Sequence, residues 1–413
     1  MQIELVKTPI KDLKLGMFVS KLDRPWLDTP FILQGFPVKT KSDINAIKKY
    51  CSYVYIDVEK QIEIEEKESV ESNQSKEKSE SIKEDFLNSF NTSILSYKDK
   101  ISFTDELPNA NKALTESNKI IHDVMGELKK SGKLKLSSVK KSTKTLMDSV
   151  LRNSDAITWL SLMKQKDDYI YRHSVSSSIY AFLLGRHLGY DQQELQMLGL
   201  GAMLLDIGKT KIPDELLNKA EVLTESETSL MRKHVDFGLE VLNQTAEVSP
   251  IVRSMLETHH ERHDGTGYPK GLAGESIPMF GRIAGIVDSF GAMTSQRPYA
   301  QQMSTYDCLR AFNQLSDKLF QKQLVEQFIQ AIGFFPTGTL VELNNESVGV
   351  VVRQNSSSKL KPDVIIILDK NKNFKDEFVT ISLEERKSLW INKGLEPGSY
   401  DIDPTEYFLI EEN

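Results

Sequence analysis

Residues 259–269 read HHERHDGTGYP, and this stretch constrains the fold of the 413-residue chain more than any other. It opens with two adjacent histidines, His259 and His260, near the predicted end of a helix. Neighbouring helical residues point about 100° apart, so both imidazoles can serve one centre only at a helix end or beside two metals. Gly265 and Gly267 then let the backbone approach a ligand closely. The stretch therefore predicts a helix end and a loop that frame a site.

Helix signals extend from this stretch in both directions, across residues 110–332. Leu195–Leu205 is almost wholly apolar, which is typical of a buried helix. Thr224 and Glu227 form a capping box ahead of a helix that is expected to carry His234. Further helices are predicted over Asn111–Leu128, Leu134–Leu160, Ile251–His259 (after Ser249-Pro250) and Arg282–Phe290. The sequence thus predicts a mainly α protein with one large helical domain.

A small module and a linker precede this domain. Residues 1–58 contain a short amphipathic segment, Lys41–Tyr50, and a β-branched, aromatic segment, Tyr53–Val58, which predict a small α+β module. Residues 59–109 begin with a run of Glu, Lys and Ser that holds too few apolar side chains to offset its ordering entropy. We assign 59–109 to a charged flexible linker.

After residue 332 the helical pattern gives way to strands. Thr339–Leu343 and Val348–Val352 indicate a hairpin with its turn at Asn344-Asn345. Val364–Leu368 indicates a third strand. Residues 333–413 are therefore predicted to be a β-rich extension rather than a catalytic core.

Charge and cysteine usage exclude several classes of protein. The net charge of −7 argues against a binder of duplex DNA, which usually presents a basic face. Cys51 and Cys308 form no disulfide framework, which favours a reducing cytoplasm. No run reaches the ~18 apolar residues of a membrane span, and the first residues lack the pattern of a signal peptide. We expect a cytoplasmic protein without a membrane span.

Histidines and buried acids gather in the helical region. Six of the seven histidines lie between His173 and His263. Asp206 and Asp288 stand within apolar runs, AMLLDIGK and IAGIVDSF, where a carboxylate is costly unless a cation accompanies it. Imidazole and carboxylate groups are ligands of Zn, Mn and Fe. A shared metal centre accounts for both acids; the alternative is that each acid meets its own Lys or Arg or caps a helix.

Motifs in one order over residues 168–313 resemble those of the HD-GYP family, a branch of the HD phosphohydrolase superfamily. They are Tyr171-Arg172-His173-Ser174, Leu205-Asp206-Ile207-Gly208-Lys209, Ile212-Pro213, His234, His259-His260-Glu261, Asp264–Pro269, Asp288 and Ser295–Tyr299. The N-terminal module and the β-rich tail also resemble the segments that accompany HD-GYP domains in bacterial proteins.

This resemblance implies a cyclic di-GMP phosphodiesterase of bacterial signalling, in which a metal-activated hydroxide hydrolyses 3′–5′ phosphodiester bonds to linear pGpG, GMP or both. It implies two divalent metal ions, iron or manganese, which clamp the attacking and leaving oxygens. The positions that match metal ligands are His173, Asp206, His234, His259, His260 and Asp288. Asp206 and Lys209 match catalytic positions, and substrate-binding positions are Lys209, Gly265, Gly267, Tyr268, Pro269 and Arg297. Protein partners are expected at the N-terminal module.

Three residues depart from the family pattern. Leu205 replaces the usual histidine before Asp206 and ligates nothing, so fewer than two bound metals is a second expectation. Gly291 replaces an aspartate three residues after Asp288. Tyr169 stands where some members carry a third-metal glutamate, so a trinuclear site is not expected.

Three functions stay open at this point. The retained ligand set favours the phosphodiesterase. Leu205 and Gly291 favour a degenerate HD-GYP module that binds cyclic di-GMP or a partner protein without turnover. Hydrolysis of other phosphodiesters by the same metals is the third. Bound-metal content together with a turnover assay separates them.

Arg297 lies in a Ser-x-Arg-Pro-Tyr segment just after the predicted helix of Asp288. The change Arg297→Ala is expected to weaken cyclic di-GMP binding by about 1.5–3 kcal/mol, the range for a hydrogen bond to a charged group. A binding titration measures this loss, and an unchanged affinity would contradict the assignment of Arg297 to ligand phosphate.

Overall fold

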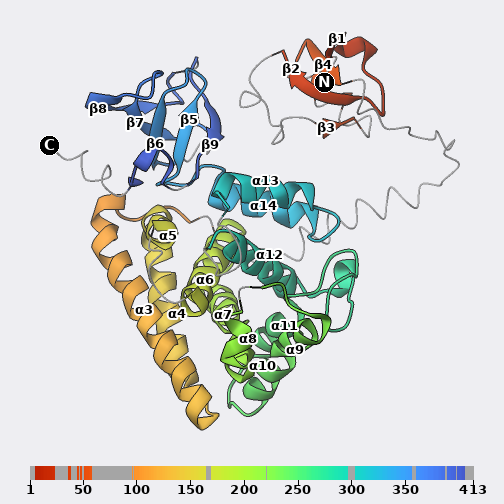
Figure 1. Ribbon diagram of the computed structural model, residues 1–413, viewed down its shortest axis with the longest axis vertical. Coiled ribbons are helices and arrows are strands. Elements are labelled where there is room, and N and C mark those ends of the chain that lie inside the picture. Colours follow the sequence, from red (N-terminus) through yellow and green to blue (C-terminus); the bar gives the residue numbers. More distant parts are fainter. Residues whose placement is uncertain are drawn as a thin grey trace, which may run out of the picture. The chain divides into compact units, whose positions relative to one another are not determined.

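The computed structural model of the protein describes residues 5–23, 36–38, 44–45, 47–48, 51–57, 95, 97–163, 169–219, 221–295, 303–355, 360–386, 388–396 and 398–404. The chain divides into two compact units, residues 1–86 and 87–413 (Figure 1). Within the described residues, no helix combines the length and the apolar character that crossing a membrane requires.

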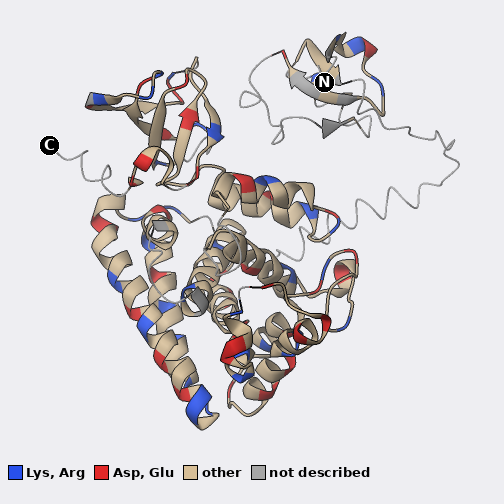
Figure 2. Ribbon diagram, in the orientation of Figure 1, with Lys and Arg blue, Asp and Glu red and all other residues tan. Residues whose placement is uncertain are grey.

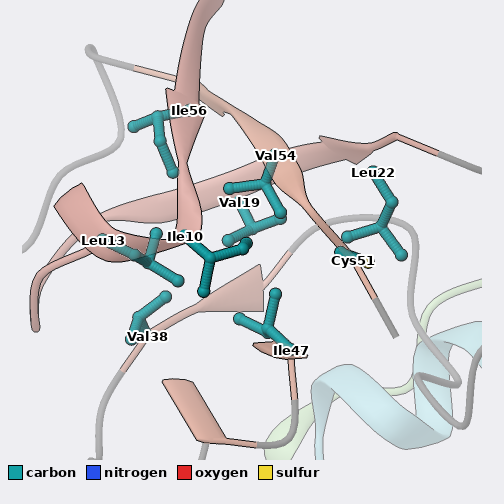
Figure 3. Packing of buried hydrophobic residues seen from close by; sticks show 9 residues of the cluster. All are labelled: Ile10, Leu13, Val19, Leu22, Val38, Ile47, Cys51, Val54 and Ile56. Carbon is teal, nitrogen blue, oxygen red and sulfur yellow. The ribbon is translucent and has the colours of Figure 1, made fainter. Parts of the chain in front are cut away.

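The N-terminal unit is a small antiparallel sheet with an apolar core. Its strands lie in the order β1 (Leu5–Pro9), β4 (Tyr53–Asp57), β2 (Phe18–Leu22) and β3 (Phe36–Pro37). Both β1 and β2 pair with β4. Figure 3 shows the buried side chains that gather on one side of this sheet: Ile10, Leu13, Val19, Leu22, Val38, Ile47, Cys51, Val54 and Ile56.

The structure tests part of the expectation for this unit. The predicted strand at Tyr53 is confirmed as far as Asp57, and Val58 lies outside the described residues. Only four residues of the predicted helix Lys41–Tyr50 are described, and all four are helical: Ile44, Asn45, Ile47 and Lys48.

Helices make up most of the second unit, as expected. They are α3 (Phe103–Ser131), α4 (Leu136–Arg152), α5 (Ser154–Met163), α6 (Tyr169–His187), α7 (Gln192–Leu204), α8 (Asp214–Leu217), α9 (Glu225–Arg232), α10 (His234–Asn243), α11 (Pro250–Thr258), α12 (Met279–Met293), α13 (Thr305–Gln314) and α14 (Lys322–Ile332), with the 3₁₀ turn η4 (Ile207–Lys211) after α7. Helix α6 packs against α7, α12 and α14, and α11 packs against α7 and α12 (Figure 1). Apolar side chains of α6, such as Ile179 and Phe182, are buried in the core.

Helix α3 begins earlier than the apolar periodicity indicates. It starts at Phe103 rather than near Asn111, because the Ser102 side chain accepts a hydrogen bond from the Asp105 N–H and caps it. The last residues of the range assigned to a linker, 59–109, are therefore helical, and residues 59–94 lie outside the described part. Acidic and basic residues are interspersed along α3 (Figure 2).

Two other helical segments are each divided in two. The predicted segment Leu134–Leu160 breaks at Asn153, whose side-chain oxygen accepts from the N–H groups of Asp155 and Ala156 and so starts α5. The capping box at Thr224 is confirmed, but the helix that it caps ends at Arg232. The expectation that this helix carries His234 is wrong, because His234 opens α10.

The C-terminal residues form a five-stranded antiparallel sheet. Its order is β8 (Phe374–Ser382), β7 (Asp363–Leu368), β6 (Val348–Arg353), β5 (Leu340–Leu343) and β9 (Ile391–Gly394). The predicted hairpin, β5 and β6, and the predicted third strand, β7, are confirmed. The sequence did not indicate β8 and β9, because both carry charged residues that obscure an apolar alternation.

Glu106 joins α3 to α4. It is fully buried and accepts hydrogen bonds from Ser149 and Arg152. The change Glu106→Ala leaves these donors without their acceptor and is expected to lower the free energy of unfolding by about 1.5–3 kcal/mol. Urea denaturation measures the loss. Glu116→Ala on the exposed face of α3 is the control, with an expected change below about 0.5 kcal/mol; equal losses would contradict a structural role for Glu106.

Candidate metal centre

The structure brings together the six side chains that the sequence assigns to a metal centre. His173 lies on α6 and Asp288 on α12, whereas the other four lie at helix ends: Asp206 between α7 and η4, His234 at the start of α10, and His259 and His260 directly after α11. Among the described residues they form two groups, His234 with His259 and His260, and His173 with Asp206 and Asp288. Within each group the possible ligand atoms lie within 4.8 Å of one another.

The first group is a set of converging imidazoles. His234 Nε2 lies 3.4 Å from His259 Nε2 and 3.2 Å from His260 Nε2. The Nδ1 atoms of His234 and His259 lie 2.7 Å from the carbonyl oxygens of Met231 and Leu256. A carbonyl only accepts, so each Nδ1 carries the hydrogen and each Nε2 presents its lone pair.

Burial keeps these imidazoles neutral. It lowers the pKa of His259 to about 4 and also lowers the pKa of His234. Burial, together with His259, lowers the pKa of His260 well below its usual range. Neutral imidazoles whose lone pairs face one another fit a bound metal cation, because the cation accepts all of these lone pairs at once.

The second group contains the two buried carboxylates. His173 Nε2 lies 2.9 Å from Asp288 Oδ1 and 3.7 Å from Asp206 Oδ2. Burial opposes ionisation of Asp288, but the hydrogen bond and charge of His173, together with His260 and His259, outweigh burial and hold the pKa of that carboxyl well below its usual range. Burial also opposes ionisation of Asp206, yet the Lys209 ammonium, 2.6 Å from Asp206 Oδ2, helps to hold the pKa of Asp206 below its ordinary value. Both acids are therefore anionic donors.

Asp206 lies between the two groups. Its Oδ1 is 3.7 Å from His234 Nε2, while its Oδ2 faces His173. Gly208 permits this arrangement, because a Cβ at that position would collide with the backbone of α10 at His234 and Gly238. The close approach of η4 to α10 thus gives one carboxylate access to both groups.

The loop after the histidines lies against this site. The Tyr268 ring stacks on His260 with centroids 4.6 Å apart. Gly267 has no room for a side chain against the backbone of residues 260–262, and Gly265 has a φ of +80°, which favours glycine. Tyr268 joins Pro269 by a cis peptide bond.

Sequence reasoning missed two residues that shape this loop. The Glu261 carboxylate accepts hydrogen bonds from the N–H groups of Lys270 and Leu272 at 2.8 and 3.0 Å, which fastens the loop to the end of α11. The Arg232 guanidinium carbon lies 4.8 Å from the centroid of the Tyr268 ring. Glu261 was visible as part of the His-His-Glu motif, but no local signal marks Arg232.

The departures from the family pattern also have places in the fold. Leu205 is buried at the end of α7 and offers no donor atom. A Cβ on Gly291 would lie 3.2 Å from His173 Nδ1, so position 291 faces the second group. Arg297 and the Tyr169 side chain lie outside the described residues.

Asp206→Ala is expected to abolish binding of divalent metal, because both groups lose the same anionic donor. Elemental analysis after dialysis against Mn²⁺ measures the bound metal, and circular dichroism checks the fold. Asp236→Ala, an exposed change in the first turn of α10, is the control and should retain the wild-type stoichiometry. Full metal content in Asp206→Ala would rule out this centre.

Comparisons with known proteins agree with the site. An HD domain model matches residues 159–324, a domain of unknown function matches residues 5–139, and a KOW domain associated with HD domains matches residues 340–402.

A cyclic di-GMP phosphodiesterase of Pseudomonas aeruginosa is 29% identical over 362 residues, 87% of this chain and 84% of that protein. A cyclic di-GMP phosphodiesterase of Thermotoga maritima is 32% identical over 220 residues, 52% of this chain and 59% of that protein. A 3′3′-cGAMP-specific phosphodiesterase of Vibrio cholerae is 32% identical over 159 residues, 38% of this chain and 30% of that protein. The chain thus contains an HD domain over residues 159–324, and these relatives agree with the resemblance of its motifs to the HD-GYP branch of that family.

Proposed function

We propose that this protein is a metal-dependent phosphodiesterase that hydrolyses the 3′–5′ phosphodiester bonds of cyclic di-GMP. The observation that carries the proposal is a pair of buried donor groups. One group contains three imidazoles, and the other contains an imidazole and two carboxylates. Asp206, a member of the second group, also faces the first. The activities named for the relatives in Pseudomonas and Thermotoga support the same substrate. A first cut yields linear pGpG, and a second cut yields GMP.

The proposed cofactor is a pair of divalent metal ions, with iron or manganese as the candidates, because imidazole and carboxylate donors suit both metals. His173, Asp206, His234, His259, His260 and Asp288 would hold them. Bound there, such ions would activate water at neutral pH and offset the charge of the phosphate.

The protein's own residues would bind and orient the nucleotide. Lys209 is partly exposed beside Asp206, so its ammonium can reach a substrate phosphate at the centre. Tyr268 offers an aromatic ring at the edge of the site, held in place by His260 on one side and Arg232 nearby. Gly265, Gly267 and Pro269 shape the loop that presents this ring. Arg297 is proposed as a second phosphate-binding cation.

The remaining parts have proposed roles in signalling. We place the protein in the cytoplasm, in keeping with a sequence that has only two cysteines, Cys51 and Cys308, far apart in the chain. The N-terminal unit is proposed to bind a protein partner that reports a signal to the helical unit.

Purified protein supplied with Mn²⁺ or Fe²⁺ is expected to linearise cyclic di-GMP, and a chelator should abolish the reaction, because the donor groups then lose their metal. Separation of nucleotides by chromatography follows the products over time. The same assay with 3′3′-cGAMP compares the substrate named for the Vibrio relative.

The decisive control uses folded protein of measured metal content. If metal-loaded protein binds cyclic di-GMP but turns over neither nucleotide, the domain is a binding module rather than an enzyme. Faster turnover of 3′3′-cGAMP than of cyclic di-GMP would retain the phosphodiesterase and change its substrate.

A further inference from the structure

The two donor groups differ in what they need from a metal. The imidazole group (His234, His259 and His260) contains only neutral nitrogen donors. The carboxylate group (His173, Asp206 and Asp288) contains one imidazole and two anionic side chains. In the absence of metal, each group must satisfy its own buried polar atoms or leave them unsatisfied, and the latter is costly.

The imidazole group cannot satisfy itself. His234 and His259 both give their Nδ1 hydrogen to a backbone carbonyl, so their Nε2 atoms meet lone pair to lone pair at 3.4 Å. A hydrogen on His260 Nε2 could serve one of these atoms but not both. A cation at this point relieves the remaining conflict, and Asp206 Oδ1 lies close enough to join as an anionic donor.

The carboxylate group has internal partners. Asp288 Oδ1 pairs with His173 Nε2 at 2.9 Å, and Asp206 Oδ2 pairs with the Lys209 ammonium at 2.6 Å. The Asp288 carboxylate is thus paired with the His173 ring nitrogen, and the Asp206 carboxylate is paired with the positive charge of Lys209. A metal ion that enters here must displace the ammonium from Asp206 and is repelled by it at short range.

The neighbouring residues do not compensate for this competition. Leu205, adjacent to Asp206 and buried, has no atom that ligates a metal. Gly291, which faces His173, has no side chain to add a donor or to orient the ring. The carboxylate group therefore offers three side chains to a metal, and one of them is already paired with a cation.

We propose that the two halves of the centre load unequally: the first divalent ion binds His234, His259 and His260 with Asp206, and Lys209 competes with the second ion for Asp206. This inference rests on the metal centre of the proposed function. It assigns to Lys209 a role in metal occupancy that is separate from its proposed contact with substrate phosphate.

The test is a Mn²⁺ titration of the metal-free full-length protein without nucleotide, followed by calorimetry and by elemental analysis after equilibrium dialysis. We expect one tight equivalent and a second at least about tenfold weaker, a difference within the range that surrounding residues impose on metal affinity. Asp288→Asn should remove only the weak event, and His260→Ala should weaken the tight one.

The Lys209 variants decide the mechanism. Lys209→Met should strengthen the second event about tenfold or more and leave the first unchanged, because the competing charge is gone. Lys209→Gln, which keeps a hydrogen-bond donor without the charge, should act in the same direction and serves if Lys209→Met does not fold. Lys211→Met is the matched control, since Lys211 pairs with the exposed Glu240 and should leave both events unchanged.

The outcomes separate this inference from the proposed function. Two equal binding events, or a second event that both Lys209 variants leave unchanged, overturn the inference while the metal centre stands. Absence of any binding in folded protein overturns both.

Discussion

Two carboxylates buried in a helical core, Asp206 and Asp288, impose the constraint on which the second unit depends. A buried anion is tolerated only beside a cation or a hydrogen-bond donor, so the residues around both acids must supply positive charge or N–H groups. His173 meets Asp288, and Lys209 meets Asp206. The apolar faces of α6, α7 and α12 surround these contacts, so solvent screens them weakly.

Helix ends provide the geometry of the imidazole group. The last carbonyls of a helix lack an intrahelical partner, and the imidazoles of His234 and His259 donate to such carbonyls near the ends of α9 and α11. That bond satisfies the helix end and at the same time turns each Nε2 toward the centre. The break at Lys233 between α9 and α10 is therefore part of the site, because a helix continuous through His234 would use the Met231 carbonyl itself.

The metal centre of the proposed function has two donor groups of different charge. Three neutral imidazoles lie on one side of Asp206, and Asp288, paired with His173, lies on the other. Asp206 itself is already paired with Lys209. Leu205 and Gly291 remove groups on which the family pattern relies, yet the six remaining donors converge. In the proposed function, the lysine that would hold substrate phosphate also pairs with the oxygen that a second metal would need.

The sequence by itself determined the mainly α class, the hairpin and third strand of the C-terminal sheet, and the clustering of histidines near two acids in apolar runs; the six ligand positions came from the resemblance to the HD-GYP family. These features have local causes: the periodicity of apolar residues, capping side chains, and ligand-type residues within apolar runs. Tertiary structure alone decided that these donors divide into two groups, that Asp206 faces both, that Lys209 pairs with Asp206 Oδ2, and that Arg232 lies over Tyr268. Each of these depends on how helices pack, and packing joins residues far apart in the chain whose contacts no local pattern encodes. The start of α3 has both kinds of cause: the Ser102 cap is local, whereas the contact of Glu106 with Arg152 of α4 depends on packing.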